Sequence, residues 1–272
     1  MNHRFTEEIF MSDLYHAEPN ELSPRPDNEP EMSEISTLGN IFLEPGRTFD
    51  ALRNKPRFII AGIIISLLVG IYSAALTAKI GETNLRNYVS EQIDKRFPDL
   101  PADQKQTSID GQMKVASIVR YLVPLFVFIS LFFGGLLYWG ASKAFGGDGG
   151  FVHNVSVWVY SSFPPTVVAM AANFVVLAFK DADSINLETS QRGLINAYTN
   201  LAFLIDGKNL PVLATVISSF DIFFIWGWIL AAIGLKRTDK LSSGSAWMVV
   251  VIIALIGVMS RVIGAFISGS PN

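Results

Sequence analysis

The chain has 272 residues, of which 50% are hydrophobic and only 17% are charged, and its formal net charge is −3. A charged fraction this far below the roughly 25% of soluble domains argues against a soluble fold, and uncharged runs of about 20 residues are typical of membrane spans. There is no cysteine, which excludes disulfides, thiolate metal sites and cysteine nucleophiles. Since the net charge is acidic, nucleic acid is not expected as a partner.

The first 36 residues differ from the rest of the chain. This tail, residues 1–36, holds nine acids, two arginines and four prolines, with no long apolar run. Such a composition buries too little apolar surface to offset the entropy of ordering, so the tail is predicted to be disordered, with docking to a partner as the alternative. It lacks a signal-peptide pattern. Translation could start at Met1 or at Met32.

Residues 37–57 lead into the first apolar stretch. Pro45-Gly46 breaks this segment, and a short amphipathic helix on the membrane surface is predicted from about Phe49. Three basic residues follow, namely Arg53, Lys55 and Arg57. We interpret them as a topogenic anchor, with a lipid-headgroup or partner site as the alternative.

Five stretches are long and apolar enough to cross a bilayer. They lie at about residues 58–78, 118–143, 154–179, 212–235 and 246–267. Each supplies the ~20 residues that span ~30 Å of hydrocarbon, and helices are required because lipid offers no partner for backbone groups. The predicted fold class is therefore all-α, a polytopic transmembrane helix bundle of five spans with short amphipathic helices at the membrane surfaces. It occupies residues 37–267, and residues 268–272 form a short C-terminal tail.

Orientation follows from the basic residues near the spans. Arg53, Lys55 and Arg57 precede the first span, and Lys236 and Arg237 follow the fourth. These sites share one side of the membrane if the N-terminus is cytoplasmic. We therefore predict a multi-pass protein of the cell (inner) membrane with its N-terminus in the cytoplasm and its C-terminus outside.

The two longer connections then face outward. In residues 79–117 a helical stripe comprises Leu85, Val89, Ile93 and Phe97, and a second helix is expected to run into span two. In the other connection a similar stripe comprises Leu194, Tyr198, Leu201 and Ile205. Both are predicted as helices that cap the outer face, with a ligand or partner surface as the alternative. The inner turn at residues 146–151 is glycine-rich and is predicted to be flexible.

Two charges, Asp221 and Arg261, fall within the spans. Each costs about 2.5–3.5 kcal/mol in hydrocarbon. They lie at similar depth on consecutive antiparallel spans, so an ion pair between them is predicted, with Asn173 as a third member of a polar cluster. One interpretation is a lock between two helices. The other is a small polar cavity for a proton, an ion or a solute.

Small residues mark two helix-packing faces. Gly62, Ser66 and Gly70 share one face of span one, and Gly257 and Gly264 share Arg261's side of span five. In membranes such residues allow close approach of helices. The face on span one could also serve a homo-oligomer, so the expected partners are the lipid bilayer and either a second copy or another membrane protein.

The order of several short phrases resembles a known family. These are PGRTF before span one, GG-x-GGF in the inner turn, YSSFPP in span three and SFDIFFIWGWILAAIGL in span four. Together they resemble the bacterial branch of the Yip (Ypt-interacting protein) domain family over about residues 37–267. The resemblance implies five helices, a cytoplasmic N-terminus and residence in a membrane. Eukaryotic members are linked to Rab GTPases and to membrane traffic and shaping.

No catalytic motif accompanies these features. Paired catalytic acids, a zinc-protease helix motif and a nucleophile elbow are all missing, so neither an enzyme activity nor a cofactor is predicted. The favoured hypothesis is a membrane-organising or partner-binding protein. The alternative is a transporter or channel for a small solute, an ion or a proton that uses the Asp221/Arg261 cluster.

Overall fold

A computed structural model describes residues 32–185, 187, 193–207 and 209–268. Within these ranges the regular secondary structure is helical and contains no strand, which confirms the all-α class. Most of the tail that was predicted to be disordered and the last four residues of the chain lie outside the described residues.

Two short helices precede the bundle. α2 (Glu34–Leu43) begins inside the segment that was assigned to the tail, because the Ser33 hydroxyl caps it by accepting from the Ser36 N–H at 3.1 Å. α3 (Pro45–Asn54) has proline at its first position, where no amide donor is needed. It therefore starts four residues before the predicted start at Phe49.

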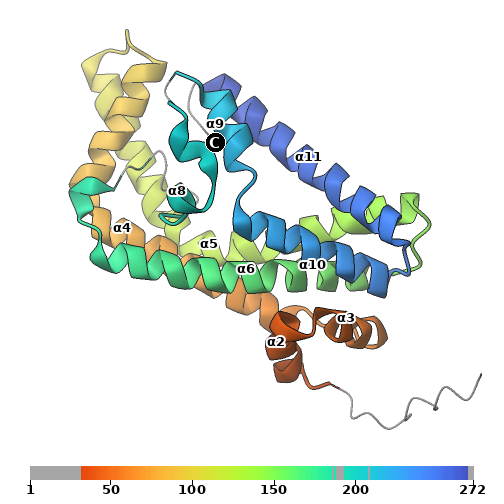
Figure 1. Cartoon of the computed structure of the whole chain (residues 1–272). Coiled ribbons are helices and arrows are strands. Elements are labelled where there is room, and N and C mark those ends of the chain that lie inside the picture. The colour runs from red at the N-terminus through yellow and green to blue at the C-terminus, as the bar shows by residue number, and fades with distance from the viewer. Residues whose placement is uncertain (1–31, 186, 188–192, 208, 269–272) are drawn as a thin grey trace, which may run out of the picture. The chain divides into compact units, whose positions relative to one another are not determined.

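The two longest helices pack along each other. α4 (Ile59–Arg96) contains span one and continues into the first long connection, and α5 (Ala102–Ala144) returns from that connection through span two. Gly81 interrupts α4 with φ 79° and ψ 161°. In Figure 1 the second half of α4 and the first half of α5 turn away from the direction of α6. We call residues 82–117 the hairpin.

The remaining spans are α6 (Phe151–Phe179), the pair α9 (Pro211–Ser218) and α10 (Ile222–Thr238), and α11 (Ser243–Ser268). α9 and α10 are bent by 48° at a short break, so residues 212–235 do not form the single helix that was predicted. Between α6 and α9 lie the short elements η1 (Ala182–Ser184), α8 (Asn196–Thr199) and η2 (Leu201–Leu204). The described residues thus hold four helices able to span a membrane, or five if the bent pair counts as one.

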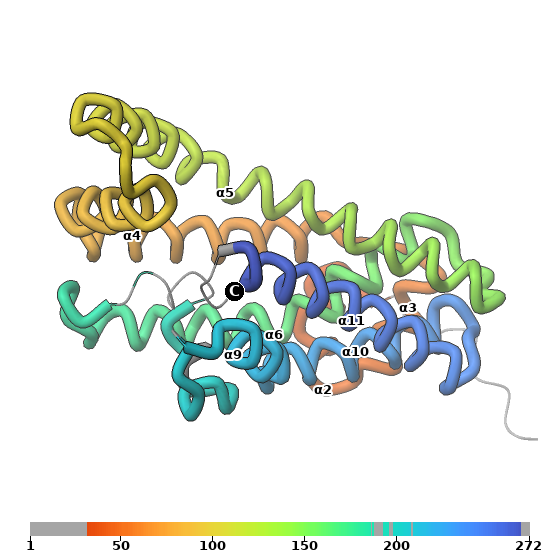
Figure 2. The backbone as a smooth tube through the Cα atoms, turned by 90° about the horizontal axis from the view of Figure 1, so that it is seen from above, coloured from red at the N-terminus to blue at the C-terminus, as the bar shows by residue number. Residues whose placement is uncertain are grey.

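α6 lies at the centre of the packing. It contacts α4, α5 and α10, and Figure 2 shows α4, α6 and α10 running alongside one another. At its crossing with α5, a Cβ on Gly135 would come within 2.6 Å of the Val155 Cα, so only glycine permits this approach. We call the end of the bundle near α3 the α3 end, and the opposite end the hairpin end.

Candidate functional site

A buried polar cluster joins three helices at the α3 end. Asp239 follows α10 and is only 1% exposed. Ser142, near the end of α5, donates to its carboxylate, and the Asn154 side-chain amide near the start of α6 donates to the same oxygen at 2.9 Å. We call Ser142, Asn154 and Asp239 the Asp239 clamp, because one carboxylate holds the ends of α5, α6 and α10 together.

The glycine-rich turn closes over this clamp. The Asp148 N–H donates to the Asp239 carbonyl at 3.1 Å. A Cβ on Gly149 would overlap the Asp239 carboxylate, and one on Gly147 would overlap the Ser142 hydroxyl. These glycines therefore allow close backbone approach to a buried acid, and the flexibility predicted for this turn stays a prediction.

The surroundings of the clamp raise the pKa of Asp239. Burial raises the pKa of Asp239, while the hydrogen bonds from Ser142 and Asn154 and the nearby His153 lower it, and burial is the larger effect. Outside the clamp, Asp148 forms an ion pair with Lys240, with 3.0 Å between the carboxylate oxygen and the ammonium nitrogen. A carboxylate fixed in this way can hold helix ends together.

The basic residues that were predicted to set the topology gather at the α3 end. Arg237 pairs with Asp50 of α3 at 3.1 Å, and Arg53 lies 3.9 Å from Asp148. Lys55 and Lys236 are exposed. The remaining member, Arg57, lies two residues before the start of α4.

The two intramembrane charges have separate partners. Asp221 caps α10, accepting from the Phe223 N–H at 2.8 Å and from the Thr199 hydroxyl. Arg261 donates to the Ser218 hydroxyl at 3.1 Å. The structure thus replaces the predicted Asp221–Arg261 ion pair with two distinct contacts. The break after α9 is the physical reason, because it turns Asp221 toward the unpaired amides at the start of α10.

Asn173 binds the second long connection. Its side-chain oxygen accepts from the Ile195 N–H at 2.9 Å, and beside it the Tyr72 hydroxyl accepts from the Leu194 N–H at 3.2 Å. Asn173 therefore holds the backbone of this connection, and its membership of a polar cluster with Asp221 and Arg261 stays a prediction.

The predicted helical stripe of this connection does not form. α8 and η2 are each four residues long. Leu194 is buried whereas Tyr198 and Leu201 are largely exposed, so they do not share one packed face.

The two small-residue faces differ. A Cβ on Gly62 would lie 3.1 Å from the Phe128 ring of α5, and a Cβ on Gly70 would overlap the Pro124 ring. Ser66, between them on the same face, is buried. Span one thus packs on α5 along this face. On α11, Gly257 has open space around it, and Gly264 is half-buried.

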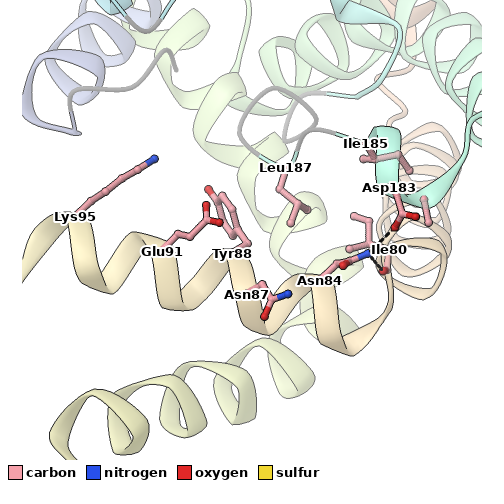
Figure 3. A pocket seen from close by; sticks show the side chains of 10 residues that line it. Ile80, Asn84, Asn87, Tyr88, Glu91, Lys95, Asp183, Ile185 and Leu187 are labelled. Carbon is pink, nitrogen blue, oxygen red and sulfur yellow. Dashed lines mark hydrogen bonds between the residues drawn. The ribbon is translucent and has the colours of Figure 1, made fainter. Parts of the chain in front are cut away.

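A polar pocket of about 500 Å³ lies beside the hairpin (Figure 3). Its lining comes from α4, mostly from the first arm of the hairpin, and from the segment after α6. It comprises Ile80, Asn84, Asn87, Tyr88, Glu91, Lys95, Ala182, Asp183, Ile185 and Leu187. Asn84 bridges the two walls through a contact of 3.4 Å to Asp183. Among the residues described, no group of three or more His, Cys, Asp or Glu side chains could hold a metal.

The helices and buried polar contacts define a polytopic all-α membrane protein. The Yip1 domain matches residues 39–264, most of the chain, and the chain therefore belongs to the Yip1 domain family. It is also similar to the membrane protein YknW of Bacillus subtilis (strain 168), with 27% identity over 249 residues that cover 88% of this chain and 93% of that relative. No solved structure matches.

The Asp239 clamp is absent from the sequence-based predictions. Asp239 adjoins Lys236 and Arg237 and resembles an ordinary loop acid. A usable signal was the coincidence of Asn154 at the start of an apolar span with the preceding glycine pairs, since a buried amide requires a partner.

Proposed function

We propose that this Yip1-family protein is a non-catalytic membrane organiser that binds a partner protein through its hairpin. The observation that carries the proposal is that residues 82–117 form an ordered helical pair with a core of its own. A connection between neighbouring spans needs only a few residues. A folded hairpin of this length is typical of an interaction element.

The hairpin is held together by apolar and ionic contacts. Val89 and Ile93 of the first arm pack on Ile109 of the second. Arg86 pairs with Asp110 at 2.7 Å, and Lys105 pairs with Asp94 at 2.6 Å. The first arm joins span one at the Gly81 bend, and the second arm runs into span two as one helix. Binding at the hairpin would therefore act on α4 and α5.

The pocket supplies a recognition surface on the hairpin. Asn87 and Glu91 are exposed on its wall, and Asp183 faces them from the neighbouring segment. Amides and carboxylates in a concave surface suit a polar segment of a partner protein.

The protein is oriented in the cell membrane with the α3 end in the cytoplasm and the hairpin outside. The clustering of Arg53, Lys236 and Arg237 at the α3 end supports a cytoplasmic location for that end and for the N-terminus. Because the chain has no native cysteine, single substitutions test this directly. An impermeant thiol reagent applied to intact cells should label Asp103→Cys on the hairpin and leave Ser242→Cys unlabelled, and the reverse pattern would invert the topology.

Photo-crosslinking in living cells tests the partner. A photoreactive residue is placed at Asn87 or Glu91, and the matched control carries it at Ser242, an exposed position at the α3 end. We expect one discrete protein adduct that is shared by both hairpin positions and absent from the control.

The adduct must also depend on the surface of the hairpin. In the protein that carries the crosslinker at Glu91, the charge reversal Asp183→Lys on the opposite wall of the pocket should abolish the adduct. The protein should still purify as a folded species. Adducts that are the same at Ser242 and at the hairpin would contradict the proposal.

Transport is a second candidate because the bundle contains a broken span. Half-helices that meet inside the membrane line many transport sites, and α9 and α10 meet at Asp221. Purified protein in proteoliposomes would then carry a proton or ion flux that Asp221→Asn abolishes. One observation argues against transport: the Asp221 carboxylate already accepts hydrogen bonds from the Thr199 hydroxyl and from the Phe223 N–H of α10.

A further inference from the structure

We propose that residues 194–205 dip into the leaflet at the hairpin end as a re-entrant element, with their apolar side chains facing lipid acyl chains. This inference is independent of partner binding at the hairpin. It also gives Asn173 and Asp221 a common task, which is to satisfy polar groups of this element inside the membrane.

Three anchors place the element at membrane depth. Tyr72 lies seven residues before Lys79, and Asn173 lies seven residues before Lys180, so each anchor is about 10 Å inward of a charged residue at its span's end. Asp221 lies ten residues after Pro211, about 15 Å along the bent pair. Since half the hydrocarbon is about 15 Å thick, all three anchors lie within one leaflet.

Five backbone N–H groups of the element donate to protein acceptors. Tyr72 and Asn173 accept from the N–H groups of Leu194 and Ile195, and the Asn200 side chain accepts from the Ala202 N–H at 2.9 Å. Local turns serve two further donors, from the Tyr198 N–H to the Ile195 carbonyl at 2.8 Å and from the Ile205 N–H to the Ala202 carbonyl at 3.0 Å. Irregular backbone at membrane depth requires such partners.

The outer surface of the element is apolar. Tyr198, Leu201, Phe203 and Leu204 are each between 63% and 68% exposed. Four large apolar side chains within seven residues would be costly in water. Lipid acyl chains are the occupant that matches both their chemistry and their depth.

The views of the backbone agree with this placement. In Figures 1 and 2, which share a horizontal axis, the segment with α8 lies beside α9 and inward of the distal end of α6. A loop that capped the bundle would lie beyond that end. The element instead runs alongside the spans.

Spin-label accessibility tests the proposal on the full chain. Single cysteines replace Leu201, Phe203 or Leu204, and the labelled proteins are reconstituted in phosphatidylethanolamine–phosphatidylglycerol liposomes. Leu255→Cys on the exposed face of α11 is the lipid reference, and Asp103→Cys is the water reference. We expect the ratio of oxygen to nickel-chelate accessibility at all three sites to match Leu255 and to exceed Asp103 several-fold.

Two results would overturn the proposal. Nickel accessibility equal to that of Asp103 would place the element in water. Low accessibility to both reagents would show that protein, such as a second copy, covers it.

A second variant tests the anchor. Thr199→Val keeps the side-chain shape but removes the donor to Asp221, so the label at Leu204 should gain nickel accessibility while the label at Leu255 stays unchanged. No change at Leu204 would show that Asp221 does not hold the element in place.

Discussion

The helices are held together at one end of the bundle and diverge at the other. At the α3 end, Ser142, Asn154 and Asp239 bring three helices into contact, and glycines let the backbone close over them. At the hairpin end, α4 and α5 continue past the bundle and contact mainly each other. A short, buried polar clamp thus fixes the helices at one end and leaves them free to diverge at the other.

This difference predicts that substitutions at the two ends of the bundle will have different effects. Changes at the α3 end should alter folding because the Asp239 carboxylate is buried and accepts hydrogen bonds from two helices. Changes at the hairpin should alter surface contacts and have small effects on folding. Matched substitutions at the two ends can therefore break or sharpen the comparison.

The largest effect is expected at Gly149. Gly149→Ala would force a methyl group into the Asp239 carboxylate and lower the free energy of unfolding by about 3 kcal/mol, as overpacking does in tight cores. Thermal unfolding in detergent measures this. The matched control Gly111→Ala lies in the hairpin with open space around it and should be neutral or stabilising by about 0.5–1 kcal/mol. Equal losses at both sites would refute the contrast.

Asp239→Ala should be the next most damaging. It leaves the buried Ser142 and Asn154 donors without their acceptor, at a cost of about 1–3 kcal/mol. Asp94→Ala in the hairpin breaks an exposed ion pair and should cost about 0.2–1 kcal/mol. Denaturation with SDS compares the two variants, and a larger loss for Asp94→Ala would invert our ranking of the ends.

Gly81 controls where the hairpin leaves span one. Its φ of 79° and ψ of 161° suit glycine almost alone, so Gly81→Ala should cost about 1–2 kcal/mol or swing the hairpin to a new angle. Distances between spin labels at Asp103 and Ser242 report the swing. Gly140→Ala in α5, which has open space, is the control. Unchanged distances and stability would show that Gly81 is not a required bend.

The stability of the α3 end should also depend on pH. Burial raises the pKa of Asp239 above its ordinary value of 3.8, so the folded state binds this proton more tightly than the unfolded state. Stability should fall as pH rises from 3.8 through the raised pKa, and Asp239→Asn should lack that part of the slope. Unfolding midpoints over this range measure it, and identical slopes in both proteins would exclude an effect of Asp239.

The smallest expected effect is the coupling between the two intramembrane charges. Because Asp221 and Arg261 bind different partners, Asp221→Asn and Arg261→Gln should be additive in stability within about 0.5 kcal/mol. A double-mutant cycle in detergent measures the coupling. A larger coupling would restore the ion pair that the sequence suggested.

Much of the fold could be predicted from residue order alone. Apolar runs of spanning length identify the membrane bundle, and the stripe at Val89 and Ile93 predicts the first arm of the hairpin. These signals are local, since each depends on residues within a few turns of one another. The order of short phrases likewise points to the Yip family, to which the chain belongs.

The polar contacts required the tertiary structure. Asp239 meets Ser142 across 97 positions and Asn154 across 85, and no local pattern specifies such pairs. The same holds for Asp221, whose depth suggested Arg261 until the break after α9 turned it toward Thr199. By itself the sequence identified the helices that are long and apolar enough to span a membrane, because hydropathy sums along the chain. The partner of each buried polar group was decided only by the packing of distant segments, because a hydrogen bond depends on position in space.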